Sequence, residues 1–522
     1  MQKIKTALIS VFDKDGLADL AKQLDSQGIK IISSGGTAEF LQKNRVPVMH
    51  ISDITGFPEI LGGRVKTLHP KIHGGILPVR SNESHMEELK NLGIECIDMV
   101  IVNLYPFEKV VSNKDVKIEE ALENIDIGGV CLIRAGAKNF HDVVVVTEPS
   151  DYPDIIEGLN ETDGSIPDGL RFKLAKKAFS RTASYDSAIS NYFESIDTKV
   201  EEKPSLPNFF IKKWEKVSEL RYGENPHQKA AFYKDLSENI PSLATSEQLS
   251  GKELSFNNIY DLDAALSLVS EFEEPAAAII KHTNPCGCST DESLATAYNN
   301  ALECDPVSAY GGIIAINRMV DTETAQLIAK TPFVEACIAP NYTEDAIKLL
   351  KKKKNRRFLK LGDLDSIFGI PPGLSFKYVL GGLLVQDRDV EDFQGDLKLV
   401  TEKKPDKEQL KSLLFAWKVC KHVKSNAILI AKGTTTAGIG AGQMSRVEST
   451  EIAIKKAGSR TKGASLASDA MFPFPDSIEL AAKAGVEAVI QPGGSIRDQE
   501  VIDAANKLGI AMVLTNFRHF KH

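Results

Sequence analysis

The chain has 522 residues, of which 42% are hydrophobic and 26% are charged, and its formal net charge is −8 with a pI near 5.8. These values are typical of a soluble globular protein with about two to four domains, and the acidic balance argues against recruitment of nucleic acid by bulk charge. We expect a cytoplasmic protein that binds no membrane, because the sequence has no apolar run of the ~20 residues that a membrane helix needs, no secretory signal, and seven scattered cysteines that favour reduced thiols.

The first part of the chain alternates short apolar runs with amphipathic stretches. The patterns predict strands and helices, in turn, at residues 6–11 (strand), 14–27 (helix), 29–33 (strand), 37–44 (helix), 98–103 (strand), 143–147 (strand) and 170–192 (helix). Strands that alternate with helices favour a parallel sheet covered by helices. Ligands usually bind at the edge formed by the carboxyl ends of such strands.

A glycine-rich segment at residues 33–39 is a candidate for binding an anion. It lies between a predicted strand and a predicted helix, where free backbone N–H groups favour negative charge. Ser34 and Thr37 add hydroxyl groups. An ordinary glycine turn with Thr37 as the helix cap is the alternative.

A second glycine-led loop, at residues 60–70, strengthens this interpretation. It places Arg64, Lys66 and Thr67 close together in the sequence. A guanidinium supplies a planar fork of donors and an ammonium supplies a point charge, and this pair suits a phosphate or an imidazole carboxamide.

Two motifs that could suggest a metal ion lack the partners that such sites need. His69 and His73 are four residues apart, but no Glu lies between them and Pro70 interrupts the helix that would carry both. Cys286 and Cys288 have Cys-x-Cys spacing without a suitable upstream His-x-Glu, so a zinc hydrolase site is not expected.

The second part of the chain is again mixed α and β. A polar, proline-punctuated stretch at residues 197–207 predicts a linker, and strands are predicted at residues 276–281 and 427–431, each leading into a polar loop. The charge run at residues 351–354 is expected to be a solvated helix end. Residues 433–442 resemble a dinucleotide-binding fingerprint only in part, so we expect a loop that closely approaches some other ligand.

The most reactive-looking pair is Lys281 and His282, at the end of a predicted strand and before a loop that Pro285 and Gly287 would impose. An imidazole is the usual proton acceptor near neutral pH. A neighbouring ammonium lowers the histidine pKa and keeps the ring neutral. The alternative is a strand-end histidine bonded to the backbone, with Lys281 solvated.

Three further polar or aromatic segments stand out. Residues 219–228 place Arg, Tyr, Asn and His in one loop. Such polar groups are costly to bury without partners, so the loop is expected either at the protein surface or in a binding site. Residues 469–476 combine aromatic residues with prolines. They could form the wall of a pocket for a flat heterocyclic ligand, or they could be a loop whose apolar side chains only fill a hydrophobic gap. The basic segment at residues 515–522 is expected to be frayed.

Short motifs follow one another along essentially the whole chain, at residues 10–16, 34–37, 55–59, 62–70, 103–107, 125–129, 220–228, 281–285, 424–426, 442–446 and 468–474. In this order they resemble the family of bifunctional purine-biosynthesis enzymes that join an AICAR transformylase to an IMP cyclohydrolase. The resemblance implies two reactions. A formyl group passes from the cosubstrate 10-formyl-tetrahydrofolate to AICAR, which gives FAICAR, and FAICAR then closes to IMP with loss of water. No metal is implied for this chemistry.

The resemblance also implies an α/β fold in two domains. Residues 1–197 would form a methylglyoxal-synthase-like parallel-sheet domain that carries the IMP cyclohydrolase. Residues 198–522 would form two cytidine-deaminase-like α/β/α subdomains that carry the AICAR transformylase. Members of the family are homodimers, so we expect transformylase sites built across the subunit interface.

For the transformylase, the resemblance implies that His282 takes the amine proton and that Lys281 or Asn426 stabilises the oxyanion that develops. The residues implied to hold the ribonucleotide are Arg221, Tyr222, Asn258, Glu335 and Arg518. Those implied to line the folate region are Arg446, Met471, Pro473 and Asp476. The family usually has Asp at the position of Glu335.

For the cyclohydrolase, the implied catalytic residues are Lys66, Tyr105, Asp126 and Lys138. The implied substrate-binding residues are Ser10, Lys14, Ser34, Gly35, Gly36, Thr37, Arg64, Thr67, Asn103 and Gly128. Both reacting groups are on one molecule, so holding the productive rotamer supplies much of the rate. Phe12 replaces the small hydroxyl residue common in the family and is left out of the predicted site.

Two other functions are compatible with parts of the sequence. The chain could retain one activity while its other half serves as a binding or regulatory module. It could also be a structural nucleotide-binding assembly factor, although the Lys281–His282 pair and the number of polar clusters favour an enzyme.

Overall fold

The computed structural model describes residues 3–113, 115–196, 206–238, 240–362, 369, 371–392 and 397–522. Contacts along the backbone divide the chain into two compact units, Met1–Lys213 and Trp214–His522, which we call unit 1 and unit 2 and describe separately. The domain boundary predicted between residues 197 and 198 lies outside the described residues and stays a prediction. None of the helices in the described ranges combines the length and the apolar character needed to cross a bilayer.

Unit 1 is built on a five-stranded parallel sheet with the strand order β3-β2-β1-β4-β5. The strands are β1 (Thr6–Val11), β2 (Lys30–Ser33), β3 (Met49–His50), β4 (Met99–Asn103) and β5 (Val144–Val146). The predicted parallel sheet and its four predicted strands are confirmed. The two-residue β3 is too short to show a periodic pattern in the sequence.

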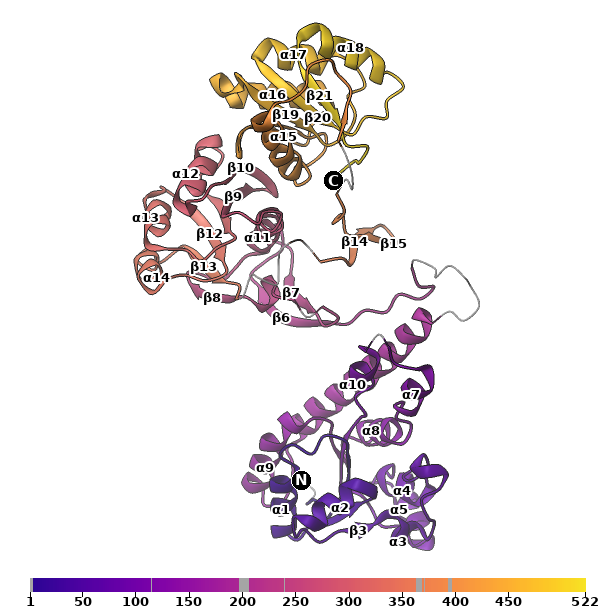
Figure 1. Ribbon diagram of the computed structural model, residues 1–522. Helices are drawn as coiled ribbons and strands as arrows, with labels where there is room; N and C mark the ends of the chain where they lie inside the picture. The colour runs from indigo at the N-terminus through magenta and orange to yellow at the C-terminus, as the bar shows by residue number, and fades with distance from the viewer. Residues whose placement is uncertain are drawn as a thin grey trace. The chain divides into compact units, whose positions relative to one another are not determined.

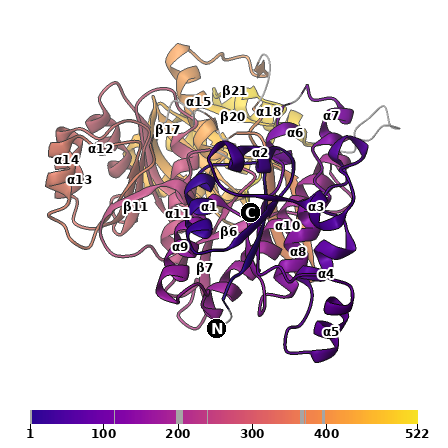
Figure 2. The same ribbon diagram turned by 90° about the horizontal axis from the view of Figure 1, so that it is seen from below.

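Helices cover both faces of this sheet (Figure 1). They are α1 (Leu17–Ser26), α2 (Gly35–Lys43), α3 (Ile51–Thr55), α4 (Pro70–Ile76), α5 (Glu83–Asn91), α6 (Phe107–Val111), α7 (Ile118–Glu123), α8 (Gly128–Lys138), α9 (Tyr152–Glu161) and α10 (Asp168–Ser195). Ile9 of β1 packs in one apolar cluster with α1 and α9, whereas Leu8 packs in the other with α4, α8 and α10. The long helix α10 runs beside α8 (Figure 2).

Unit 2 is built on a 12-stranded sheet with the order β16-β21-β20-β19-β17-β18-β10-β9-β11-β12-β13-β8. Its first half contains α11 (Phe256–Val269), β9 (Ala276–Lys281), β10 (Asn284–Thr290), α12 (Leu294–Cys304), β11 (Gly312–Ile316), α13 (Thr322–Lys330), β12 (Val334–Ala339), α14 (Glu344–Leu350) and β13 (Arg357–Lys360). Its second half contains α15 (Lys407–Cys420), β17 (Ile428–Lys432), β18 (Thr435–Gly440), α16 (Arg446–Ala457), β19 (Ala464–Ser468), α17 (Asp476–Ala484), β20 (Val486–Gln491), α18 (Asp498–Leu508) and β21 (Ala511–Leu514). The same order of helix, hairpin and three helix–strand pairs occurs twice, as expected for two similar α/β/α subdomains.

Six remaining strands of unit 2 lie outside these two series of elements. β8 (Glu247–Ser250) and β16 (Lys398–Leu399) form the two edges of the large sheet. Two separate hairpins are formed by β6 (Trp214–Leu220) with β7 (Ala230–Asp235) and by β14 (Leu374–Val379) with β15 (Gly382–Asp387). The charge run at residues 351–354 follows the end of α14 and is exposed, as predicted.

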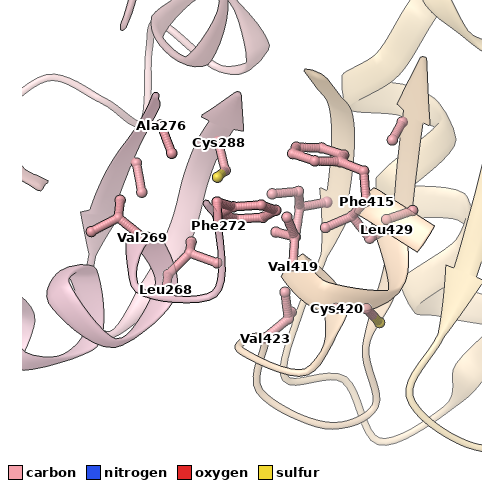
Figure 3. Packing of buried hydrophobic residues seen from close by; sticks show 14 of the residues in the cluster. Leu268, Val269, Phe272, Ala276, Cys288, Phe415, Val419, Cys420, Val423 and Leu429 are labelled. Carbon is pink, nitrogen blue, oxygen red and sulfur yellow. The ribbon is translucent and has the colours of Figure 1, made fainter. Parts of the chain in front are cut away.

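The two halves of unit 2 share one sheet and one apolar core. Ser289 of β10 pairs with Thr435 of β18, which makes the sheet continuous. The ring of Phe272, just after α11, lies 5.4 Å from the ring of Phe415 on α15 in a cluster drawn from both halves (Figure 3). The first-half hairpin is therefore held at a fixed place relative to the second half.

Two segments predicted as loops are instead buried strands. Residues 435–440, within the expected ligand loop, form β18, and residues 284–290 form β10. An added Cβ at Gly438 would lie 2.1 Å from the carbonyl oxygen of Ala453, and one at Gly287 would lie 1.9 Å from that of Ala301. The glycines thus allow α16 and α12 to pack closely on the sheet, and the prediction of a ligand loop at residues 433–442 is wrong.

Candidate active sites

A cavity of about 630 Å³ lies at the carboxyl ends of the parallel strands of unit 1, the edge at which the sequence predicts a ligand. Its walls come from the ends of β1, β2 and β4, from the 62–67 loop and from the start of α8. The predicted cyclohydrolase residues that line it are Ser10, Lys14, Ser34, Gly36, Thr37, Arg64, Lys66, Thr67, Asn103, Tyr105, Asp126 and Gly128.

Two predicted cyclohydrolase residues are not among the lining residues. Lys138 is the last residue of α8 and is exposed. Gly35 is the first residue of α2, and an added Cβ there would lie 3.1 Å from Nζ of Lys66. Gly35 therefore makes room for Lys66, and the catalytic role of Lys138 stays a prediction.

The Lys66 side chain occupies a slot between two glycines. An added Cβ at Gly63 would lie 2.7 Å from Cε of Lys66, and both Gly35 and Gly63 have left-handed φ values, 49° and 89°. The carboxylate of Glu59 lies at the end of the slot, with Oε2 3.7 Å from Nζ of Lys66. Glu59 is absent from the predicted site, and its place in the motif at residues 55–59 is the signal that could have found it.

Asp126 lies just before α8 and is partly buried. Burial raises the pKa of its carboxyl group, against the smaller lowering effects of backbone N–H groups and of the Lys66 charge. The N–H of Gly129 donates to Oδ1 of Asp126 at 2.7 Å, and the Asp126 N–H donates to the hydroxyl of Tyr185 at 2.8 Å. The carboxyl group is thus held at the cavity wall with a pKa closer to neutrality than that of an ordinary aspartate.

Two predicted binding residues also fix the backbone of the site. Oγ1 of Thr37 donates to the carbonyl of Val11 at 3.0 Å and accepts its N–H at 3.2 Å. Oδ1 of Asn103 accepts the N–H groups of Phe12 and Asp13 at 2.6 and 2.9 Å. The Thr37 hydroxyl is engaged in this way, so the free N–H groups of the first turn of α2 are the donors left to face an anion.

Sequence reasoning missed several residues that line the cavity, and two of them contact predicted site residues through their side chains. Phe12, left out of the predicted site, lines the cavity, and its ring packs edge-on against Tyr105 with centroids 5.5 Å apart. Glu123 also lines the cavity and forms an ion pair with Arg64. Arg64 and Glu123 are 59 positions apart in the chain, so no local spacing could have predicted the pair.

In unit 2 the Lys281–His282 pair lies at the turn of the β9–β10 hairpin. Lys281 pairs with Asn284, so His282 and Thr283 form a two-residue turn, and both have left-handed φ values, 52° and 61°. The carboxylate of Asp261 on α11 accepts the N–H groups of His282 and Thr283 at 3.2 and 2.7 Å. Asp261, which sequence reasoning missed, therefore supports an otherwise unfavourable turn conformation.

The two candidate catalytic side chains at this turn have different surroundings. Nζ of Lys281 donates to the carbonyl of Tyr310 at 2.8 Å, so Lys281 is anchored, unlike in the solvated alternative. The side chain of His282 is exposed in the single chain. The geometry presents an imidazole at the surface of unit 2, beside a fixed ammonium.

A second-half segment that begins at Lys424 lies against this turn. Oδ1 of Asn284 accepts the N–H of Lys424 at 2.9 Å. The amide of Asn426 donates to the carbonyl of Gln443 at 3.0 Å and accepts from Arg446 at 2.8 Å. Candidate residues from the two halves of unit 2 thus belong to neighbouring segments.

Arg446 is buried and fully engaged. Its guanidinium pairs with Asp469 and donates to the hydroxyl of Ser468 at 2.9 Å, in addition to its bond to Asn426. These contacts hold Asn426 in one orientation. The predicted contact of Arg446 with folate stays a prediction.

The other predicted transformylase residues fall into two groups. Asn258 is buried and forms the capping box of α11 with Ser255, and Glu335 pairs with Arg357 at 2.7 Å. Tyr222 is half-buried, and exposed side chains are those of Arg221, Met471, Pro473, Asp476 and Arg518. Asn258 and Glu335 therefore have structural partners within the chain, whereas the exposed group is accessible to a ligand.

The cysteines have the character of packing residues. All seven lie in the described ranges and are unpaired. Burial raises the pKa of the Cys286 thiol to about 12 and that of Cys288 higher, so both stay protonated. Within the described ranges, no three His, Cys, Asp or Glu side chains are grouped so as to hold a metal ion.

Two models of known protein families match consecutive parts of this chain. A family model described as "MGS-like domain" matches residues 16–131, and one described as "AICARFT/IMPCHase bienzyme" matches residues 136–456, more than half of the chain. The chain belongs to the AICARFT/IMPCHase bienzyme family. It is therefore a bifunctional enzyme of purine biosynthesis, with AICAR transformylase and IMP cyclohydrolase activities, and the expected methylglyoxal-synthase-like first domain is confirmed.

Relatives of this bienzyme match it over almost its whole length. The "Bifunctional purine biosynthesis protein PurH" of Acetivibrio thermocellus is 54% identical over 99% of this chain and 100% of its own. The protein of the same name from Bacillus subtilis (strain 168) is 50% identical with the same coverage. A solved structure titled "Crystal structure of ForH" is 34% identical over 36% of this chain and 96% of its own, with a TM-score of 0.33.

Proposed function

We infer that unit 1 of this bienzyme closes FAICAR to IMP and that unit 2 transfers the formyl group from 10-formyl-tetrahydrofolate to AICAR. The observation that carries the assignment is the cavity in unit 1, because it gathers at one sheet edge residues that come from five separate segments of the chain. The turn that carries Lys281 and His282 supports the assignment of the transformylase to unit 2.

For ring closure, the carboxamide nitrogen of FAICAR must attack the formyl carbon of the same molecule, and water must leave. We assign the nucleotide phosphate to the first turn of α2 and to Arg64, where N–H groups and a guanidinium face the cavity. Asp126 then removes a proton from the attacking nitrogen, and Lys66 stabilises the oxyanion and protonates it to a hydroxyl group. Asp126 returns its proton to this hydroxyl as water leaves, and the former formyl nitrogen gives its proton to Lys66. Tyr105 packs beside Phe12 and keeps the ring in the reactive rotamer.

For formyl transfer, the amine of AICAR is a weak nucleophile because its lone pair is delocalised into the imidazole carboxamide. His282 takes the amine proton as the C–N bond forms. The Lys281 ammonium, fixed by the Tyr310 carbonyl, and the Asn426 amide, fixed by Arg446, stabilise the oxyanion of the tetrahedral intermediate. The carbonyl re-forms as the bond between the formyl carbon and the folate nitrogen breaks, and tetrahydrofolate leaves with the proton that His282 took from the amine.

The proposal includes a homodimer in the cytoplasm. The exposed side chain of His282 supports it, because a base must be partly shielded from water and a second copy would provide that cover. The hairpin β14–β15 also supports it, since Tyr378, Leu380 and Leu384 are 86%, 107% and 59% exposed in one chain. Exposed Met471 and Pro473 are assigned to folate and Arg221 and Arg518 to the ribonucleotide.

The test is to supply AICAR and 10-formyl-tetrahydrofolate to the purified protein and to measure both FAICAR and IMP. The proposal expects IMP as the product, and it expects IMP from FAICAR without any folate. Accumulation of FAICAR would show that unit 1 does not carry out the assigned reaction, and failure to formylate AICAR would remove the assignment of unit 2.

A further inference from the structure

The predicted frayed end of the chain is instead tied to unit 2 by a buried histidine. The side chain of His519 is 1% exposed. Its Nδ1 lies 2.8 Å from Oδ2 of Asp389, and its Nε2 lies 3.6 Å from Oδ1 of Asp392. An imidazole placed between two carboxylates is favoured in its protonated form.

Aromatic residues enclose this histidine. The indole of Trp417 on α15 lies 5.2 Å from the His519 ring and donates its N–H to Asp392 at 2.8 Å. The ring of Phe517 lies 5.2 Å from His519 as well. Two of the groups that contact His519, Trp417 and Asp392, thus contact each other, which fixes the position of the imidazole.

Backbone contacts extend from His519 to the candidate transformylase site. The His519 N–H donates to the carbonyl of Asp469 at 3.2 Å, and the Lys521 carbonyl accepts the N–H of Ser425 at 3.0 Å. The carboxylate of Asp469 pairs with Arg446, which in turn orients Asn426. The segment around His519 therefore supports the same loop that presents Asn426.

We propose that His519, clamped between Asp389 and Asp392, is a positioning residue that fixes the segment at residues 515–522 for formyl transfer. The clamp sets the place of Arg518, the neighbouring residue assigned to the ribonucleotide, and braces Ser425 beside Asn426. The role of the clamp rests on the proposed function of unit 2. His519 itself touches neither reacting group.

The charges around the clamp give it a dependence on pH. Burial lowers the pKa of His519 and the charge of Lys421 lowers it further, but the contacts with Asp389 and Asp392 outweigh both, so the pKa is raised above its ordinary value. A histidine whose pKa is raised by folding contributes stability that is complete below its unfolded pKa and is lost as pH rises through the folded value. The clamp is therefore favoured at pH values below this raised pKa and weakens as pH rises through it.

The test compares the full-length wild-type protein with His519→Gln, which keeps an N–H donor but cannot carry a charge. We expect the KM for AICAR in formyl transfer to rise about tenfold at pH 7, a loss of roughly one good contact, with a smaller change in kcat. In the wild type that KM should rise between pH 7 and pH 9, whereas in His519→Gln it should already be high and stay flat. Cyclisation of FAICAR by the same molecules should be unchanged.

His422→Gln is the matched control, since burial lowers the pKa of His422 to about 4 and the ring is already neutral over this pH range. That variant should keep the wild-type dependence of KM on pH. A His519→Gln protein with the wild-type KM and pH profile would overturn the proposal, and so would equal losses in both reactions.

Amide hydrogen exchange separates the clamp from the proposed function. In His519→Gln, and in the wild type at pH 9 after correction for intrinsic rates, the amides of residues 515–522 should exchange faster than in the wild type at pH 7. Unchanged protection would refute the clamp even if formyl transfer is affected. A wild-type protein that transfers no formyl group would refute the proposed function, and the exchange data alone would then decide on the clamp.

Discussion

Asp126 and His282, the two residues proposed as bases, have different surroundings. Burial and the start of α8 surround Asp126, and its raised pKa brings its proton equilibrium closer to the working pH. His282 instead projects from a two-residue turn whose backbone is held by Asp261, beside the anchored Lys281. The pKa of Asp126 is shifted by groups within one chain. The side chain of His282 is exposed in one chain, so its shielding from water would have to come from a ligand or from a second copy.

The substitution His282→Ala tests the residue assigned as the base of formyl transfer. We expect formyl transfer to fall by about 10²–10⁴-fold, the usual contribution of a positioned general base. Cyclisation of supplied FAICAR should remain at the wild-type rate, because the cavity of unit 1 contains no part of this turn. Steady-state assays of each reaction are the measurement, and equal loss of both would contradict the assignment of two separate sites.

The substitution Asp126→Asn tests the pH dependence of ring closure. If Asp126 is the base, wild-type cyclisation should decline as pH falls through a pKa above that of an ordinary aspartate, because burial raises it. The variant should lose most cyclisation and also this acid limb, while its amide oxygen can still accept the Gly129 N–H. Rate profiles between pH 4 and pH 9 provide the measurement, and an acid limb that survives in Asp126→Asn would assign it to another group.

Stability should change in the opposite direction to activity in the same variant. A carboxyl group whose pKa is raised by folding is less favourable when ionised, so the protein carries a cost at pH 7 that disappears when the group is protonated. Asp126→Asn should therefore unfold at an equal or higher denaturant concentration than the wild type at pH 7. This outcome also shows that lost cyclisation does not come from unfolding.

At the scale of elements, the two central hairpins of unit 2 have the same packing and different residues at their turns. β10 and β18 each carry a glycine against which a helix packs, Gly287 with α12 and Gly438 with α16. The β9–β10 turn contains His282 and Thr283, whereas the β17–β18 turn lies at Gly433 and Thr434. One turn of the pair carries the side chain that we propose as the base of formyl transfer, and the other keeps the glycine that such a turn favours.

The substitution Gly438→Ala tests the packing of α16 on β18. A Cβ would lie 2.1 Å from the Ala453 carbonyl oxygen, a backbone atom that cannot move away alone. We expect unit 2 to lose about 3 kcal/mol or more of unfolding free energy, at the upper end of overpacking effects. Gly382→Ala on β15 is the control, because its Cβ would contact Val379 at an ordinary 3.5 Å, and a change within about 0.5 kcal/mol is expected.

Denaturant unfolding, followed together with both activities, is the measurement. Formyl transfer should be lost at a lower denaturant concentration in Gly438→Ala, while the cyclisation of unit 1 should follow the wild-type curve. Similar stability of the two alanine variants would contradict the role given to Gly438.

The sequence predicted elements well where periodicity and burial agree. The strands at residues 6–11 and 276–281 have the predicted bounds because each is a continuous apolar run in a buried sheet. The glycines at residues 433–442 were misleading, since a glycine needed for close helix packing and one needed for a ligand look alike in one sequence. The duplicated order of elements in unit 2 was implied only by the family resemblance. Corresponding elements of the two halves begin 151 to 154 residues apart, but a repeated order of elements without an evident repeat of residues cannot be read from the sequence alone.

The candidate site residues were also predicted correctly where the information is local in the sequence. Side chains within a short motif, such as Arg64, Lys66 and Thr67, were predicted together and lie together. Their partners were not predicted, because contacts such as Asp261 with His282 join segments that only the fold brings together. The motif supplies the reactive groups, and the tertiary structure supplies what orients them.

At the scale of the whole molecule, the two units to which we assign the two reactions have separate cores. Unit 1 has one apolar cluster on each face of its sheet, and unit 2 has three clusters of its own. None of these clusters in the described ranges includes residues from both units. Each site can therefore fail while the other remains folded and active.

This independence predicts complementation between two defective full-length proteins. His282→Ala should formylate AICAR only at a small residual rate, and Lys66→Ala should convert AICAR to FAICAR while cyclising it slowly. An equimolar mixture should form IMP, because FAICAR released by the Lys66→Ala protein can be closed by the intact unit 1 of the His282→Ala protein. A lag that shortens as more His282→Ala protein is added is expected, since free FAICAR must first accumulate.

The measurement is the time course of AICAR, FAICAR and IMP. A mixture that makes IMP no faster than Lys66→Ala alone would mean that FAICAR is not exchanged between molecules or that one substitution damages both units, and cyclisation of added FAICAR by His282→Ala distinguishes the two.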